Sequence, residues 1–199
     1  MSFGFGFGVP FARVLASVPG GGPVTYATWN PADKNANVIL SGGDLIAGIT
    51  TGGIWSPVRA NVGKATGKWM WEDTIHGGSV RMIGIATASA TLASYLGSDA
   101  YGYGYFLNDG SVYHNASNPA YGAPGTDGDV FTHMLNMDTL QYQIKKNGTT
   151  QGFFSIAPLS GLTVFPATSL YSPNTDTTGT NFGATAFIYP QAGYAGVSS

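Results

Sequence analysis

The chain has 199 residues, contains no cysteine, and carries eight Lys and Arg against ten Asp and Glu, for a formal net charge of -2. Its length suits one domain with a single apolar core, and the lack of cysteine excludes disulfides and thiolate metal sites. Charged residues make up only 9% of the chain, and the few basic ones are dispersed, so we expect no nucleic acid partner.

The first 24 residues differ in composition from the rest and are predicted to form an extended arm. Phe alternates with Gly over residues 3–8, and prolines and a Gly-Gly-Gly run interrupt any regular element before residue 25. The arm has no cationic segment and its glycines break any apolar helix, so we expect neither a signal peptide nor membrane insertion. It either folds back on its own domain or, in the interpretation we favour, contacts a neighbouring subunit, because a free arm would leave large apolar groups in water. The predicted contact residues are Phe3, Phe5, Phe7 and Phe11.

Residues 25–190 are predicted to form one all-β domain, a sandwich of two antiparallel sheets. Short alternating or apolar runs are separated by turn signals, and almost no stretch has a helical period. The turn signals predict four hairpins, with turns at residues 41–44, 76–79, 108–110 and 147–148. Further strands are expected over residues 129–135, 162–170 and 181–189. One helical turn is expected at residues 90–96, and residues 191–199 are expected to form a tail of coil.

The strand predicted to begin at Lys68 has two different faces. Trp69, Trp71 and Asp73 point to one side, whereas Met70 and Glu72 point to the other, because side chains alternate along a strand. Two indoles give the first face a large apolar area. We therefore expect Trp71 to lie in the core.

Several short motifs follow one another in a fixed order and together resemble the SPRY (B30.2-like) domain family. They begin with Gly67-Lys-Trp-Met-Trp-Glu72 and Ile83-Gly-Ile-Ala86, continue through Lys146-Asn-Gly148, and end with Asn181-Phe-Gly183. The resemblance covers about residues 60–190. It implies a concanavalin-like jelly roll that acts as a non-enzymatic interaction module and binds through variable loops.

No pattern of catalytic or metal-binding residues is found. Glu72 and Asp73 are neighbours on opposite faces of a strand and cannot form the carboxylate pair of a glycosidase. Asp127 and Asp129 share a face if that segment is extended, which allows a calcium site, but a turn with a solvated Asp is the interpretation we favour. The three histidines, His76, His114 and His133, lack zinc-site spacing. We therefore predict a protein that is not an enzyme, with no catalytic residue, metal or cofactor.

The residues predicted to bind a partner, besides the arm, lie in the loop that follows His114. This loop is polar, rich in turn residues, and contains an aromatic side chain of a kind that anchors binding surfaces. The predicted contacts are Asn115, Asn118 and Tyr121. The loop over residues 171–180 is a second candidate.

The leading functional hypothesis is a structural protein of a tailed-bacteriophage virion. The domain fills nearly the whole chain, and the Phe-Gly opening resembles the N-termini of such proteins. In this hypothesis the arm binds other virion proteins in an oligomeric assembly, and the sandwich is displayed for contact with a protein or glycan of the host surface. The alternatives are a carbohydrate-binding module that uses Trp29 or Trp55, unless these indoles seal the sandwich rim, and an intracellular SPRY adaptor.

Overall fold

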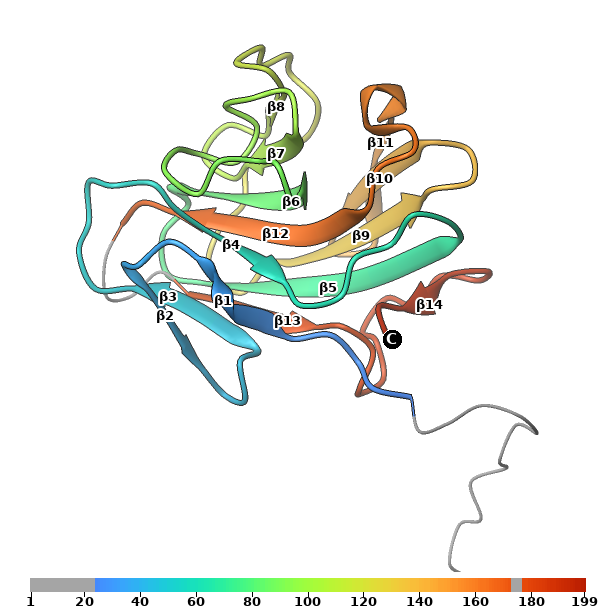
Figure 1. Ribbon diagram of the computed structural model, residues 1–199, viewed down its shortest axis with the longest axis horizontal. Helices are drawn as coiled ribbons and strands as arrows, with labels where there is room; N and C mark the ends of the chain where they lie inside the picture. The colour runs from blue at the N-terminus through green and yellow to red at the C-terminus, as the bar shows by residue number, and fades with distance from the viewer. Residues whose placement is uncertain (1–23, 173–176) are drawn as a thin grey trace, which may run out of the picture.

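The computed structural model describes residues 24–172 and 177–199, which form two β-sheets packed face to face (Figure 1). This confirms the predicted all-β sandwich. Within these residues the one helix is a short 3-10 turn, η1 (Ala157–Leu159), and none is long and apolar enough to cross a membrane. The four Phe residues predicted to anchor the arm lie outside the described residues.

The six-stranded sheet ends at β1 on one side and at β8 on the other. Its strands in spatial order are β1 (Trp29–Lys34), β4 (Ser56–Ala60), β12 (Val164–Leu170), β6 (Arg81–Thr87), β7 (Gly102–Phe106) and β8 (Val112–Tyr113). The neighbouring strands are all antiparallel.

The eight-stranded sheet ends at β11 on one side and at β2 on the other. Its strands in spatial order are β11 (Thr149–Ser155), β10 (Gln141–Lys146), β9 (Val130–Asn136), β5 (Lys68–His76), β13 (Thr177–Asn181), β3 (Ile46–Ile49) and β2 (Val38–Ser41). A short parallel strand, β14 (Ala195–Gly196), joins the first residues of β5.

The core between the sheets is rich in aromatic rings. Trp71 is fully buried, as predicted, and stacks on His133 with ring centroids 4.6 Å apart. Trp29 is also fully buried and lies edge-on to Phe182, with centroids 5.3 Å apart. Trp29 therefore seals the sandwich, and it has no exposed face to offer a sugar ring.

The hairpin predicted around residues 76–79 does not form. β5 and β6 belong to different sheets, so the segment between them crosses from one sheet to the other. Arg81 stabilises this crossing, because its Nη2 donates to the carbonyls of His76 at 2.7 Å and Gly78 at 2.6 Å. The other three predicted hairpins are confirmed as β2-β3, β7-β8 and β10-β11.

The helical turn predicted at residues 90–96 is also wrong, since this loop has no helix. Its backbone N–H groups are bound by side chains in local turns: Asp99 Oδ2 accepts from Thr91 N at 2.8 Å, and Thr91 Oγ1 accepts from Ala93 N at 3.1 Å. Such local acceptors compete with helical hydrogen bonds. The loop instead packs Ala90 and Leu96 against Met82 on the outer face of the six-stranded sheet.

Two expectations near the C-terminus fail because this segment is bound to the sandwich. The strand predicted over residues 181–189 ends at Asn181, and Glu72 then accepts hydrogen bonds from the N–H groups of Ile188 and Tyr189, each at 2.7 Å. The tail predicted as coil contains β14, and Val197 beside it is fully buried. The last residues therefore belong to the sandwich.

Candidate functional site

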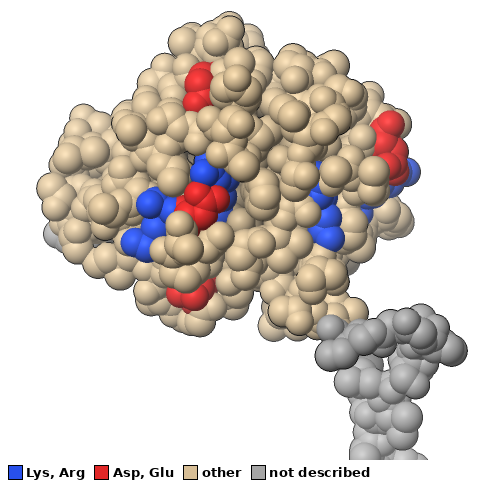
Figure 2. All heavy atoms as spheres, in the orientation of Figure 1, with Lys and Arg blue, Asp and Glu red and all other residues tan. Residues whose placement is uncertain are grey.

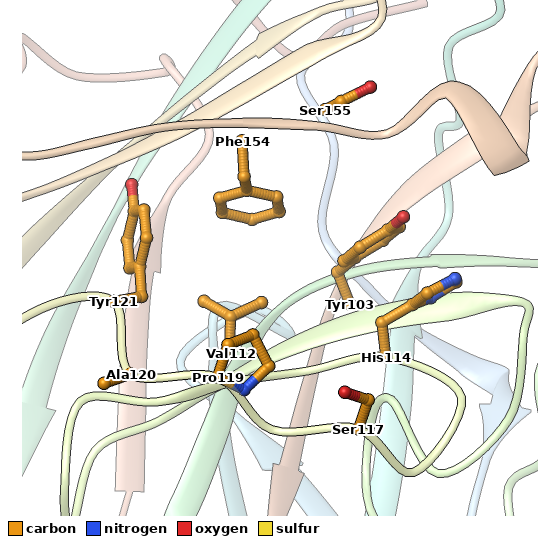
Figure 3. Close-up of a pocket in the computed structure, with 9 residues that line it drawn as sticks. All are labelled: Tyr103, Val112, His114, Ser117, Pro119, Ala120, Tyr121, Phe154 and Ser155. Atoms are coloured by element: carbon orange, nitrogen blue, oxygen red, sulfur yellow. The ribbon is translucent and has the colours of Figure 1, made fainter.

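A pocket lies between an edge of one sheet and an edge of the other. β8 ends one sheet and β11 ends the other, and residues of both face the same space of about 350 Å³. Phe154 lies opposite Val112 and Pro119, with Tyr121 on one side and Tyr103 and His114 on the other (Figure 3). The lining residues are Tyr103, Val112, His114, Ser117, Pro119, Ala120, Tyr121, Phe154 and Ser155.

Strand alternation explains why aromatic side chains line this pocket. On β7, Tyr103 and Tyr105 point between the sheets, whereas Gly104 lies against the loop over residues 88–99. On β11, Phe154 points inward opposite Tyr142. The ring centroid of Phe154 is 5.5 Å from that of Tyr103 and 5.1 Å from that of Tyr121. These separations are typical of packed aromatic pairs, so the wall has a defined shape.

Of the three contact residues predicted in the loop after His114, Tyr121 is the one that lines the pocket. Its hydroxyl donates to the carbonyl of Gly152 and accepts from Ile144 N at 3.1 Å. Ile144 lies where the register between β10 and β11 shifts. Burial raises the pKa of Tyr121 to about 12, although the hydrogen bond from Ile144 opposes the rise. The phenol therefore anchors the loop, and its ring is what the pocket presents.

The other two predicted loop residues do not line the pocket. Asn115 is exposed, has a positive φ of 49°, and donates its backbone N–H to Asp99 O at 3.0 Å. Asn118 is exposed, and its amide donates to the hydroxyl of Tyr113 at 3.3 Å. Both side chains lie in the loop that borders the pocket, not inside it.

His114 supplies a polar group at the pocket wall. Its ring is parallel to that of Tyr103, with centroids 3.9 Å apart, and its Nδ1 lies 2.9 Å from the carbonyl of Gly102. A carbonyl can only accept, so Nδ1 carries the proton in this contact. In the tautomer with its proton on Nδ1, Nε2 is a hydrogen-bond acceptor.

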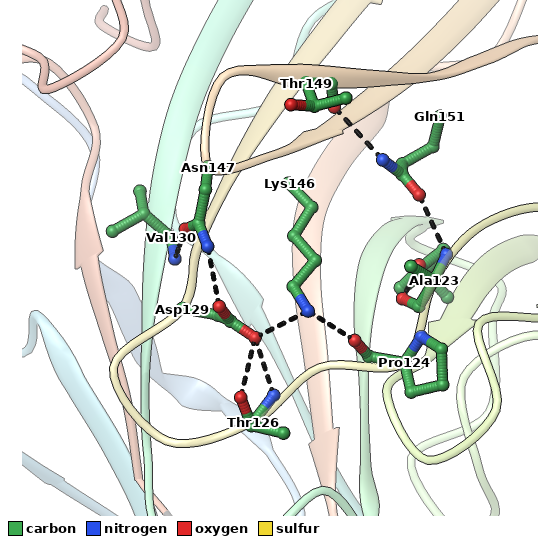
Figure 4. A network of polar contacts seen from close by, with 10 residues as sticks. Ala123, Pro124, Thr126, Asp129, Val130, Lys146, Asn147, Thr149 and Gln151 are labelled. Atoms are coloured by element: carbon green, nitrogen blue, oxygen red, sulfur yellow. Dashed lines mark hydrogen bonds and ion pairs between the residues drawn. The ribbon is translucent and has the colours of Figure 1, made fainter.

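A polar network fixes the loop that follows Tyr121 (Figure 4). Asp129 accepts from Lys146 Nζ at 2.9 Å, Asn147 Nδ2 at 2.7 Å and Thr126 N at 2.8 Å. Lys146 Nζ also donates to the carbonyl of Pro124 at 2.7 Å. Burial alone would raise the pKa of Asp129, but the hydrogen bonds, of which the one from Lys146 is the strongest, hold it below its ordinary value.

The two carboxylates considered for calcium do not act together. Asp129 is neutralised by Lys146, whereas Asp127 is exposed and accepts from Gly77 N at 2.9 Å. The residues that the structure describes contain no group of three or more His, Cys, Asp or Glu placed to hold a metal ion. The interpretation as a structural turn is the one that the contacts support.

A histidine and a carboxylate meet inside the core. His133 Nε2 lies 3.0 Å from Asp73 Oδ2, and His133 Nδ1 contacts the hydroxyl of Tyr142. Thr180 Oγ1 donates to Asp73 Oδ1 at 2.5 Å. The side chains of His133 and Asp73 have no exposed surface, so a substrate has no access to them.

A second aromatic group lies on the outer side of the six-stranded sheet. The half-buried ring of Trp55 is 5.0 Å from Tyr171, 6.0 Å from Tyr95 and 6.1 Å from Phe106. Trp55 is thus held in a cluster of rings and is not a free indole. Tyr171 begins the second predicted loop, which is shorter than expected, because β13 already begins at Thr177. Residues 173–176 lie outside the described residues.

Sequence analysis found Tyr121 but missed the residues that form most of the pocket. Tyr103, Val112 and Phe154 have the pattern of core residues on strands, and nothing in their sequence shows that they lie at the open side of the sandwich. One signal in the sequence did point to this place. In the hairpin with its turn at residues 108–110, the second strand covers only residues 111–114, and so short a strand suggests the edge of a sheet.

Comparisons with known proteins agree with this architecture. Residues 68–185 match the SPRY domain family. The human SPRY domain-containing SOCS box protein 2 is 31% identical over 167 residues, which cover 71% of this chain and 60% of that protein. The chain thus spans less than two thirds of the length of this curated relative.

Solved structures with the same fold share little sequence with the chain. The SPRY domain of human HERC1 has a TM-score of 0.67 at 18% identity, over 79% of this chain and 99% of that one. The TRIM65 PSpry domain has a TM-score of 0.65 at 16% identity, over 78% and 89%. At these identities the match establishes the fold.

Proposed function

The chain belongs to the SPRY domain family, and we propose that it is an interaction module that binds a segment of a partner protein in the pocket between Tyr103 and Phe154. SPRY domains in general bind protein partners, and most are non-catalytic. The proposal adds the place of binding and the kind of side chain bound, which is a large apolar group enclosed by rings from both sheets.

The observation that carries the proposal is the composition of the pocket. None of its nine lining residues is Asp, Glu, Lys or Arg, and three of them, Tyr103, Val112 and Phe154, are large apolar or aromatic side chains on strands. Ser117, Ser155 and His114 add polar groups. Ligand sites usually have this form, an apolar concavity of roughly 300–1,000 Å³ with a few polar groups. Only 9% of the chain is charged, and the face shown in Figure 2 is largely tan, which fits recognition that does not depend on salt bridges.

The adaptor setting is better supported than the virion setting. The curated relative combines a SPRY domain with a SOCS box in one protein. This is the arrangement expected of an adaptor, in which one domain binds a partner and a second segment has a separate role. None of the relatives described above is a virion protein. The virion location, virion partners, host-surface contact and oligomeric assembly expected from the sequence therefore gain no support.

The proposal is tested by selecting binders from a random peptide library on the full chain. Selected peptides should share one large apolar residue. Ala120→Arg, at the exposed part of the pocket, should weaken their binding by about 100-fold, because a bound peptide would cover the new charge and leave it without a partner, which costs several kcal/mol. Ile39→Arg serves as the control, since Ile39 is 51% exposed on β2 at the other end of the eight-stranded sheet. Peptides without a common apolar residue, or equal binding by both variants, would refute the proposal.

A further inference from the structure

The pocket between Tyr103 and Phe154 lies next to an open strand edge. Among the described residues, β11 has β10 as its one neighbouring strand, because it ends the eight-stranded sheet. Phe154 on β11 lines the pocket, and Phe153 beside it is 59% exposed. A free edge with an adjacent apolar pocket is the combination that binds an extended chain, in which backbone pairing gives affinity and the pocket takes alternate side chains.

The chain itself contains a segment of this kind at its N-terminus. Residues 3–8 read Phe-Gly-Phe-Gly-Phe-Gly. If this segment is extended, side chains alternate, so Phe3, Phe5 and Phe7 all point to one face and the glycines to the other. The first charged residue is Arg13. The segment therefore offers a row of apolar groups without charge, which matches a pocket whose nine lining residues carry none.

The register of the strands shows that this segment can reach β11 of its own chain. Ala195 pairs with Trp69, Trp69 with Leu135, Leu135 with Tyr142, and Tyr142 with Phe154. This row has four steps of about 4.8 Å, or about 19 Å in all.

The arm begins close to the first strand of that row. Ser199 N donates to Thr25 O at 2.9 Å, and Tyr26 pairs with Ser198. The three residue steps from Ala195 to Ser198 add about 10 Å at most. Residues 9–23 can span up to about 50 Å when extended, which exceeds the total of about 30 Å.

We propose that residues 3–8 are an intramolecular ligand of this pocket. One Phe of the segment inserts among Tyr103, Tyr121 and Phe154, and the backbone of the segment follows β11. The inference rests on the proposed function, because it assigns an occupant to the same site. A partner protein then has to displace the segment, so the arm sets how tightly the partner binds.

The absence of cysteine from the chain allows a test by disulfide formation in the full chain. Gly6→Cys keeps all three Phe residues and is combined with Ser155→Cys at the pocket. The matched control carries the same two cysteines and has Phe3, Phe5 and Phe7 changed to Ser. Ser155 on β11 is exposed, and the arm has the same length and the same starting point in both variants. An arm that does not dock would therefore reach Ser155 about equally often in the two variants.

We expect the intrachain disulfide to form at least about 10-fold faster in the variant that keeps the three Phe residues than in the one with Ser in their place, because docking raises the effective concentration. Mass spectrometry of the monomer on a non-reducing gel identifies the linked peptides. Equal rates for the two variants, or disulfides only between two copies, would overturn the proposal.

The two proposals fail in different ways. If disulfide rates are equal while Ala120→Arg still weakens the binding of selected peptides by about 100-fold, the intramolecular ligand is refuted and the binding site stands. If Ala120→Arg also has no effect on those peptides, both proposals are refuted together.

Discussion

The rings of Tyr103 and Phe154 come from different sheets and lie 5.5 Å apart. Tyr103 is on β7, next to the last strand of one sheet, and Phe154 is on β11, the last strand of the other. The open side of the sandwich is therefore closed by aromatic contacts and not by a hydrogen-bonded strand. A pocket remains where these rings meet.

We predict that Tyr121→Phe lowers the free energy of unfolding by about 1–3 kcal/mol. The substitution removes the acceptor for Ile144 N and the donor to Gly152 O, and buried groups that lose a partner carry such a cost. Urea denaturation measures the change. Tyr101→Phe, at a ring that is 45% exposed, is the control and should stay within about 0.5 kcal/mol of wild type. Equal stability of the two variants would mean that Tyr121 does not anchor the loop.

The same phenol should make stability depend on alkaline pH. The pKa of Tyr121 is raised by burial to about 12, against about 10 in the unfolded chain. The protonated phenol thus contributes stability that is fully present below about pH 10 and is lost as pH rises towards about 12. The difference in unfolding free energy between wild type and Tyr121→Phe should shrink over this interval. A constant difference would contradict the assignment.

A prediction at acid pH concerns Asp129. Hydrogen bonds, chiefly from Lys146, hold the pKa of Asp129 below its ordinary value despite burial. Its contribution is therefore present above about pH 3.9, the unfolded pKa, and is lost as pH falls through the lower folded pKa. We expect Asp129→Asn to cost about 1–3 kcal/mol at neutral pH and less in acid. Chemical denaturation at both pH values checks this, and an equal cost at the two would contradict it.

Two glycines on strands should respond in opposite ways to substitution by Ala. A Cβ at Gly104 would lie 2.2 Å from the carbonyl oxygen of Leu96, whereas one at Gly179 would meet nothing closer than 3.7 Å. Gly104→Ala must move the loop over residues 88–99 and should destabilise by more than about 2 kcal/mol. Gly179→Ala should be neutral or slightly stabilising, since Ala reduces the entropy of the unfolded chain. Thermal unfolding of both variants tests whether that loop lies on the sheet.

Local patterns predicted most strands, but they could not assign each strand to a sheet. The alternation from Lys68 onward correctly placed Trp71 in the core. The Gly-Gly turn at residues 77–78 has the composition of a hairpin, yet it joins two sheets. The residues of a turn show that the chain reverses direction there. They do not show which strand the next segment pairs with, because strand pairing is decided by contacts distant in sequence.

The pocket was hidden from sequence analysis for a related reason. Phe154 and Val112 are ordinary inward-facing strand residues, and they line a pocket only because β11 and β8 happen to end their sheets. Tyr121, whose ring lines the pocket, could be singled out because it is an aromatic residue in a polar loop rich in turn residues. The failure at residues 191–199 has the same origin, since β14 contains only two residues and depends on its contact with β5.

The measurement that tests the central claim most directly is NMR mapping of a selected peptide on the isotopically labelled full chain. We predict that the largest shifts occur at the methyl groups of Val112 and Ala120 and at the ring of Tyr103, which line the pocket. Shifts concentrated instead at Trp55 and Tyr171, in the aromatic group on the outer side of the six-stranded sheet, would contradict the account.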